Sequence, residues 1–143
     1  MTNPYAAFKT DKAMEMEGIW LDYGIFRVRV RRSGGSNNKY AAALAKALRP
    51  YRAQLQAGTL DQTTEQRITA EVFADTVIVT WECKDAKGNW CTGIHNQKGK
   101  IEDYATDKVV AILMDLPDLF MDIQMQAGSK RNFQEDLEDD AKN

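Results

Sequence analysis

One stretch of the chain alternates strictly between apolar and polar residues. Phe26, Val28 and Val30 are separated by arginines, and this period of two predicts a half-buried strand. Residues 18–21 are interpreted as its partner strand, with a short turn at 22–24 between the two. Because a two-stranded hairpin is marginal alone in water, we expect helices to cover its apolar face. Downstream of the hairpin the pattern predicts helix or loop.

Apolar residues at intervals of three and four predict a helix from Lys39 to Ala57. Pro50 removes a backbone donor and clashes with the preceding turn, so we expect a kink or restart there. Gly58 is suited to the left-handed residue that closes a helix.

A second helix is expected after the polar start signals of residues 59–65. Its apolar side begins at Ile68 and keeps helical spacing to Val79, which favours a helix continuing to about Glu82. The run 76–81 is rich in β-branched residues and also fits a strand. Helix is the preferred interpretation for this run.

The remainder is expected to be a loop followed by helices. Residues 83–104 are polar and glycine-rich, with at most an irregular hairpin around 90–94. Thr106 is expected to cap a helix that breaks at Leu116–Pro117 and resumes to Gly128. A last short helix would contain Phe133 and Leu137 and end in acidic residues, whose charge opposes the helix dipole.

Together these patterns predict an α+β fold in which an N-terminal β-hairpin packs against a mostly helical body of four to five helices. The chain is expected to form a single domain over residues 1–143. Its predicted parts are an extended, mobile arm (1–10), the hairpin region (12–32), the helical body (37–127, with the loop 83–104), and a short helix with an acidic tail (128–143).

Charge is distributed unevenly along the chain. The net charge is −2, but residues 1–60 carry +6 and residues 101–143 carry −7. Such asymmetry favours contacts with copies of the chain or with two different partners. No signal peptide and no run long enough to span a bilayer is present, so we expect a soluble intracellular protein without membrane association.

The sequence contains little catalytic chemistry. Cys83, Cys91 and His95 offer three ligands at irregular spacing, unlike paired metal-binding cysteines, so no metal and no cofactor is predicted. Asp115, Asp118 and Asp122 share a helix face, which is interpreted as a solvated acidic surface rather than an acid/base site. We therefore do not expect an enzyme.

The basic strand face consists of Arg27, Arg29, Arg31 and Arg32. The preferred interpretation is a charged, solvent-facing strand surface that discourages aggregation. An acidic protein partner is the second interpretation. Nucleic-acid binding is the third, because such domains are usually strongly basic and this chain has a pI of about 5.4.

The helices around Pro117 are the most plausible partner-binding region. They carry more apolar residues than one buried face requires, and methionines adapt to varied partners. Burial and partner binding are equally supported for this set, which comprises Leu113, Met114, Leu116, Phe120, Met121, Ile123 and Met125.

Several segments resemble the tail assembly chaperones of long-tailed bacteriophages. The resemblance is carried, in scattered blocks from end to end of the chain, by residues 5–12, 17–24, 32–35, 115–124 and 137–143. It implies a small, largely helical, non-enzymatic protein of the host cytoplasm that is absent from the mature virion. It also implies that the protein keeps the tape measure protein soluble and gathers tail tube subunits around it.

In many such phages a ribosomal frameshift makes a longer second form, and the ending Ala141-Lys-Asn143 is compatible with slippery codons. The partners implied are therefore the tape measure protein, the tail tube protein, the longer form and a homo-oligomer. The alternatives are a structural tail or head-completion protein of a phage, and a nucleic-acid-binding module using the arginines.

Overall fold

A four-stranded antiparallel sheet lies at one side of the molecule. The computed structural model describes residues 3–135. The sheet has the order β1-β2-β3-β4, and these strands span Ile19–Asp22, Phe26–Val30, Ile78–Lys84 and Trp90–Thr92. In its register Leu21 lies opposite Val28, and Val28 opposite Trp81, with a bulge between Arg29 and Val30.

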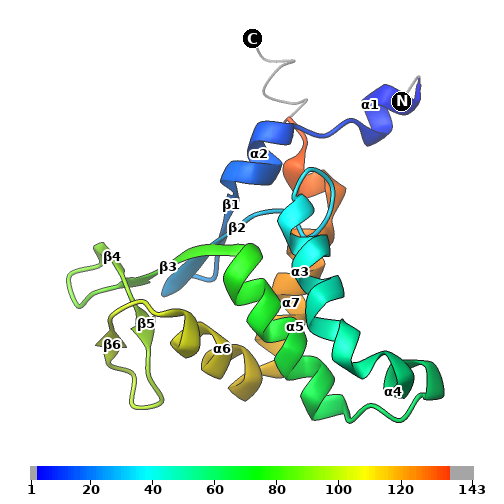
Figure 1. Cartoon of the computed structure of the whole chain (residues 1–143). Coiled ribbons are helices and arrows are strands. Elements are labelled where there is room, and N and C mark those ends of the chain that lie inside the picture. Colours follow the sequence, from blue (N-terminus) through cyan, green and yellow to red (C-terminus); the bar gives the residue numbers. More distant parts are fainter. Residues whose placement is uncertain (1–2, 136–143) are drawn as a thin grey trace.

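Helices gather to one side of this sheet, to the right in Figure 1, while the small β5–β6 hairpin lies at the lower left. The hairpin strands are Ile94–His95 and Ile101–Glu102. The α-helices are α1 (Pro4–Phe8), α2 (Lys12–Glu17), α3 (Asn38–Leu48), α4 (Arg52–Ala57), α5 (Gln62–Thr76), α6 (Thr106–Asp115) and α7 (Pro117–Gly128), and the 3₁₀ turns are η1 (Arg49–Tyr51) and η2 (Lys130–Phe133).

The sheet buries one face against α5, α6 and α7. Val28, Val30 and Trp81 are almost completely buried there, and they pack with Phe73 and Ile123 of the helices. None of the residues that alternate toward the other face is buried. The α+β class, with an N-terminal hairpin seated on helices, is therefore confirmed.

Several predicted boundaries are also confirmed. Pro50 divides the first long helix into α3, η1 and α4, and Gly58 ends it with a φ of 69°. Pro117 separates α6 from α7, with Leu116 in a non-helical conformation between them. Gly128 is the last residue of α7.

The prediction of helix to Glu82 was wrong. Helix α5 ends at Thr76, and residues 78–84 form β3, which pairs with both β2 and β4. The β-branched run 76–81 fits a strand, and here the backbone pairing with two neighbours outweighs the continuous helical spacing. As a result, the hairpin belongs to a larger sheet instead of standing alone on helices.

Three further segments differ from the sequence prediction. The arm was expected to be extended, yet Pro4 opens α1, where proline fits the first helical position and Asn3 Oδ1 accepts a hydrogen bond from the Ala6 N–H. The hairpin region 12–32 begins with α2. The predicted loop 83–104 contains β4, β5 and β6. In the last predicted helix only η2 is described, and Leu137 lies outside the described residues.

A buried ion pair joins α2 to the segment that precedes α3. The Glu15 side chain is 2% exposed, and one of its oxygens lies 2.5 Å from Arg32 Nη1. Ser36 Oγ donates to the other oxygen at 2.9 Å. Gly35 packs against the same carboxylate so closely that a Cβ atom there would clash with Glu15 Oε2. The close approach explains why glycine is needed at this position.

An apolar cleft at the junction of α6 and α7

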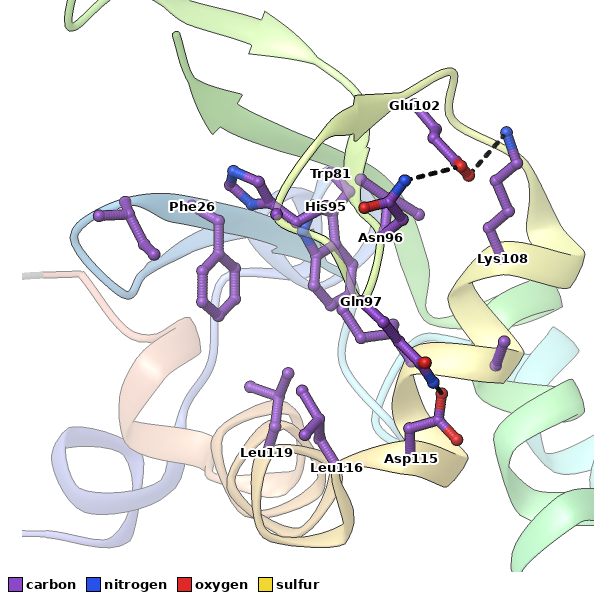
Figure 2. Close-up of a pocket in the computed structure, with 15 residues that line it drawn as sticks. Phe26, Trp81, His95, Asn96, Gln97, Glu102, Lys108, Asp115, Leu116 and Leu119 are labelled. Carbon is purple, nitrogen blue, oxygen red and sulfur yellow. Dashed lines mark hydrogen bonds and ion pairs between the residues drawn. The ribbon is translucent and has the colours of Figure 1, made fainter. Parts of the chain in front are cut away.

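A cavity of about 800 Å³ opens between the sheet, the β5–β6 hairpin and the junction of α6 and α7. We call it the elbow cleft. In Figure 2, Phe26 on one side and Leu116 and Leu119 on the other point toward the same space. Its lining residues are Ile25, Phe26, Trp81, Ile94, His95, Asn96, Gln97, Gly99, Glu102, Lys108, Ala111, Ile112, Asp115, Leu116 and Leu119.

A ladder of stacked rings builds one wall of the cleft. Phe26 stacks on Trp81, with ring centroids 5.6 Å apart, and on Tyr23 at 4.9 Å. Trp81 is 1% exposed, so its ring is fixed by the core around it. Ile25, in contrast, is 66% exposed at the rim. This wall is therefore rigid at its base and apolar up to the solvent.

The opposite wall is shaped by Pro117. Proline lacks an N–H and is well suited to the first position of a helix, so α7 starts there in a new direction. Leu116, the residue before it, takes φ −123° and ψ 75° and is 48% exposed. The break in the helix thus leaves an apolar side chain at the rim instead of burying it.

Polar contacts tie the β5–β6 hairpin to α6 at the rim of the cleft. Gln97 Nε2 donates to Asp115 Oδ2 at 3.3 Å, and Lys108 Nζ lies 3.6 Å from Glu102 Oε2. Asn96 Nδ2 donates to Glu102 Oε1 at 3.1 Å. The hydrogen bond from Asn96, assisted by Lys108, lowers the pKa of Glu102. All these contacts lie at the rim (dashed lines in Figure 2) and leave the interior apolar.

The apolar set predicted for partner binding is divided by the structure. Leu113, Phe120 and Ile123 are 1%, 5% and 0% exposed and belong to the core. Met121 and Met125 are 60% and 68% exposed.

A smaller hollow of about 280 Å³ lies between α5 and the α6–α7 junction. The half-buried Met114 and the exposed Met121 both line it. Of the predicted set, only Leu116 lines the elbow cleft.

The predicted basic strand face is largely engaged within the molecule. Arg27 pairs with Glu82 and lies between two indoles, its Cζ 4.2 Å from the Trp20 ring centroid and 4.5 Å from that of Trp90. Nε of Arg29 and of Arg31 donates to main-chain carbonyls of α2. Arg32 forms the buried pair with Glu15. Moreover, β2 is an interior strand of the sheet.

The cysteines face each other across β3 and β4. Cys83 Sγ donates to the carbonyl of Gly93, and Cys91 Sγ to that of Cys83, each at 3.2 Å. Burial raises the pKa of the Cys83 thiol. His95 instead lines the elbow cleft. Within residues 3–135, no group of three or more His, Cys, Asp or Glu side chains is placed to hold a metal ion.

The predicted acidic face is not uniform. Asp115 accepts from Gln97, Asp122 accepts from the Tyr23 hydroxyl, and Asp118 is exposed. The sequence did not identify Ile25 or Trp81 as site residues. A local signal existed only for Ile25, an apolar residue next to a turn glycine, where polar residues are usual.

None of the helices in the described part of the chain is long and apolar enough to cross a membrane.

Searches of curated proteins and of solved structures found no significant match. A family model described as "YdaY prophage protein" matches residues 35–143, about three quarters of the chain, including α3 to α7 and most of the elbow cleft. This phage-derived chain therefore belongs to the YdaY prophage protein family.

Proposed function

We propose that this prophage protein is a tail assembly chaperone that holds an apolar, helical segment of the tape measure protein in the elbow cleft. The observation that carries the proposal is the cleft itself: about 800 Å³, lined mainly by apolar side chains, with Ile25 and Leu116 exposed at its rim. Clefts of 300–1,000 Å³ with such a lining commonly bind ligands.

The size and lining of the cleft suit a few side chains of an amphipathic helix. Such helices bind grooves through apolar residues spaced three and four apart. Phe26, held in place by its stacking on the buried Trp81, would supply aromatic contact area of the kind that dominates the energy of many interfaces. Exposed Met121 and Met125 extend the apolar surface along α7 and would add adaptable contacts with a long client.

A binding role is also proposed in preference to an enzymatic one. The charged and amide side chains of the cleft pair with one another at the rim and do not converge on one point where a substrate would react. Binding without catalysis requires only the apolar interior.

The remaining parts of the proposal follow from the resemblance to tail assembly chaperones. The protein would act in the host cytoplasm and be absent from the mature virion. It would recruit tail tube subunits and associate with a longer frameshifted form and with copies of itself. The opposite net charges of residues 1–60 and 101–143 favour such contacts.

Co-expression with the tape measure protein of the same prophage tests the proposal. The soluble fraction of the tape measure protein, measured after ultracentrifugation, is expected to rise severalfold when the full chain is present. An unchanged soluble fraction would contradict a chaperone role. Stoichiometric amounts of the chain in purified virions would instead identify a structural tail or head-completion protein.

A further inference from the structure

Strand β1 forms an outer edge of the sheet. Among the residues that the structure describes, it pairs only with β2. An unpaired edge offers a row of N–H and C=O groups to another strand. β1 contains no proline, no lysine and no arginine, and its register with β2 has no bulge. The usual devices that protect an edge are therefore missing, apart from its short length and Asp22.

The hydrogen-bond pattern identifies the groups that are free. The Tyr23 N–H donates to the Phe26 carbonyl, so this pair closes the hairpin. Along an antiparallel pair of strands, hydrogen-bonded residue pairs alternate with pairs that are not hydrogen-bonded. The next hydrogen-bonded pairs after Tyr23–Phe26 are therefore Leu21–Val28 and Ile19–Val30. The N–H and C=O groups of Trp20 and Asp22 therefore point away from β2, toward the open edge.

A groove of about 430 Å³ runs along this edge. All residues from Ile19 to Tyr23 line one side, and Asp122, Gln126 and Asn132 line the other. An added strand would lie about 4.8 Å from β1. The groove lies between β1 and residues of α7 and η2. It is separate from the elbow cleft, with which it shares no lining residue.

The charges of the groove select its occupant. Two of its eight described lining residues are aspartates and none is basic. Asp22 lies on the outward face of the sheet, where the neighbouring Arg27 pairs with Glu82 and not with Asp22, and Asp122 lies on the helix side. Asp22 is exposed, and Asp122 accepts one hydrogen bond, from the Tyr23 hydroxyl at 2.6 Å. A second copy pairing through β1 would bring another Asp22 to this acidic edge. A strand carrying lysine or arginine would instead neutralise it.

We propose that the β1 edge receives an extended, basic segment of a partner protein by strand addition. The added strand forms backbone hydrogen bonds to Trp20 and Asp22, and a basic side chain on the outward face of the sheet lies beside Asp22. Strand addition gives affinity through the main chain and specificity through the side chains. This interaction goes beyond the proposed client binding and does not depend on it, because it uses a different surface.

The test uses the full chain labelled with ¹⁵N and the peptide Thr-Lys-Val-Lys-Val-Thr with blocked ends, with Glu replacing Lys in the control peptide. The Lys peptide is expected to shift the amide signals of Trp20 and Asp22 and to slow their hydrogen exchange by about tenfold at saturation, equivalent to about 1.4 kcal/mol. The Glu peptide is expected to leave them unchanged. Equal effects of the two peptides, or none, would overturn the proposal.

Two variants separate the backbone from the side chain at position 20. Trp20→Pro removes the outward N–H and leaves the inward N–H groups of Ile19 and Leu21 in place, whereas Trp20→Thr removes only the indole. The proline variant is expected to lose peptide binding and the threonine variant to keep most of it. Equal binding by both would overturn the proposal. Slow hydrogen exchange of the Trp20 and Asp22 amides in concentrated wild-type protein without peptide would also overturn the proposal, because a second copy of the chain would then occupy the edge.

Discussion

The Tyr23 hydroxyl donates a hydrogen bond of 2.6 Å to Oδ2 of Asp122, a residue 99 positions later in the chain. It connects the turn of the β1–β2 hairpin to the middle of α7. The Tyr23 ring also stacks on Phe26, which forms one wall of the elbow cleft. This single contact therefore holds the hairpin, α7 and the cleft wall in one arrangement.

Removing this hydroxyl is expected to destabilise the fold. Tyr23→Phe keeps the stacked ring but loses a hydrogen bond to a charged acceptor, which we expect to lower the free energy of unfolding by about 1.5 kcal/mol. Burial, followed by the hydrogen bond and charge of Asp122, raises the pKa of Tyr23 above its usual value of 10.0. The stabilisation by the protonated Tyr23 hydroxyl is therefore complete below pH 10 and is lost as the pH rises toward the pKa of Tyr23 in the folded protein.

Urea unfolding at pH 7 and at pH 11 measures both effects. The difference between wild type and Tyr23→Phe should be smaller at the higher pH. Asp122→Asn, which retains an oxygen acceptor, is the matched control and should cost less than Tyr23→Phe. A tyrosine variant as stable as wild type at pH 7 would show that the hydroxyl contributes nothing.

Because of the buried Glu15–Arg32 pair, we expect the stability of the protein to fall in acid. Burial raises the pKa of Glu15, but the hydrogen bonds from Arg32 and Ser36 and the charge of Arg32 outweigh it, so the pKa lies below 4.5. The ionised Glu15 carboxylate therefore stabilises the fold fully above pH 4.5, and this stabilisation is lost as the pH falls through the pKa of Glu15 in the folded protein. Glu15→Gln should cost about 3 kcal/mol at pH 7, because it leaves Arg32 unpaired.

Thermal unfolding between pH 3 and pH 7 tests this expectation. The gap between wild type and Glu15→Gln should narrow toward low pH. Glu17→Gln, on the exposed side of the same helix, is the control and should follow the wild-type curve at an almost constant offset. A gap that stays constant across the range would contradict the assigned role of the Glu15 carboxylate.

The two thiols are expected to differ in reactivity. Cys83 is buried, and burial raises its pKa, so little of the reactive thiolate forms at pH 8. Cys91 is partly exposed. Iodoacetamide should therefore modify Cys91 first and Cys83 only on unfolding, as mass spectrometry of timed samples would show. Modification of both at one rate in the folded protein would contradict the placement of Cys83.

Patterns along the sequence identified the strand of Phe26–Val30 and the helix breaks at Pro50 and Pro117, because each depends on local chemistry. The strand at Ile78–Lys84 was missed since its helical spacing continues that of α5, and only pairing with β2 and β4 decides between the two conformations. Such non-local pairing leaves no periodic signal in one sequence.

The site was located only in part for the same reason. Leu116 was identified from its position beside a proline in an apolar region. Phe26 and Trp81 come from strands 55 residues apart, and their stacking exists only once the sheet has formed. The seven predicted partner-binding residues share helical spacing, but burial by α5 and the sheet separates them into core and surface.

Because the structure divides these seven residues between core and surface, we expect substitutions at the two kinds of position to differ in their effect on stability. Ile123→Ala should cost about 3 kcal/mol because it leaves a cavity in the core. Met125→Ala, two residues away on the same helix, should change stability by no more than about 0.5 kcal/mol. Chemical denaturation of the two variants measures both values. Similar losses for the two would contradict the orientation of α7.

Leu116→Asp tests whether the elbow cleft holds the client. Leu116 is the N-cap residue of α7, where aspartate is favourable, and the C-cap residue of α6, where a negative charge is unfavourable. Because its side chain is 48% exposed, the variant should fold with little change in stability. Gln56→Asp adds the same charge on the exposed surface of α4 and serves as the control.

The measurement is the amount of tape measure protein recovered in soluble complex with each variant, after thermal unfolding has verified that both variants fold. We expect Leu116→Asp to lose most of the complex while Gln56→Asp retains it. Full recovery with Leu116→Asp would show that the elbow cleft does not hold the client.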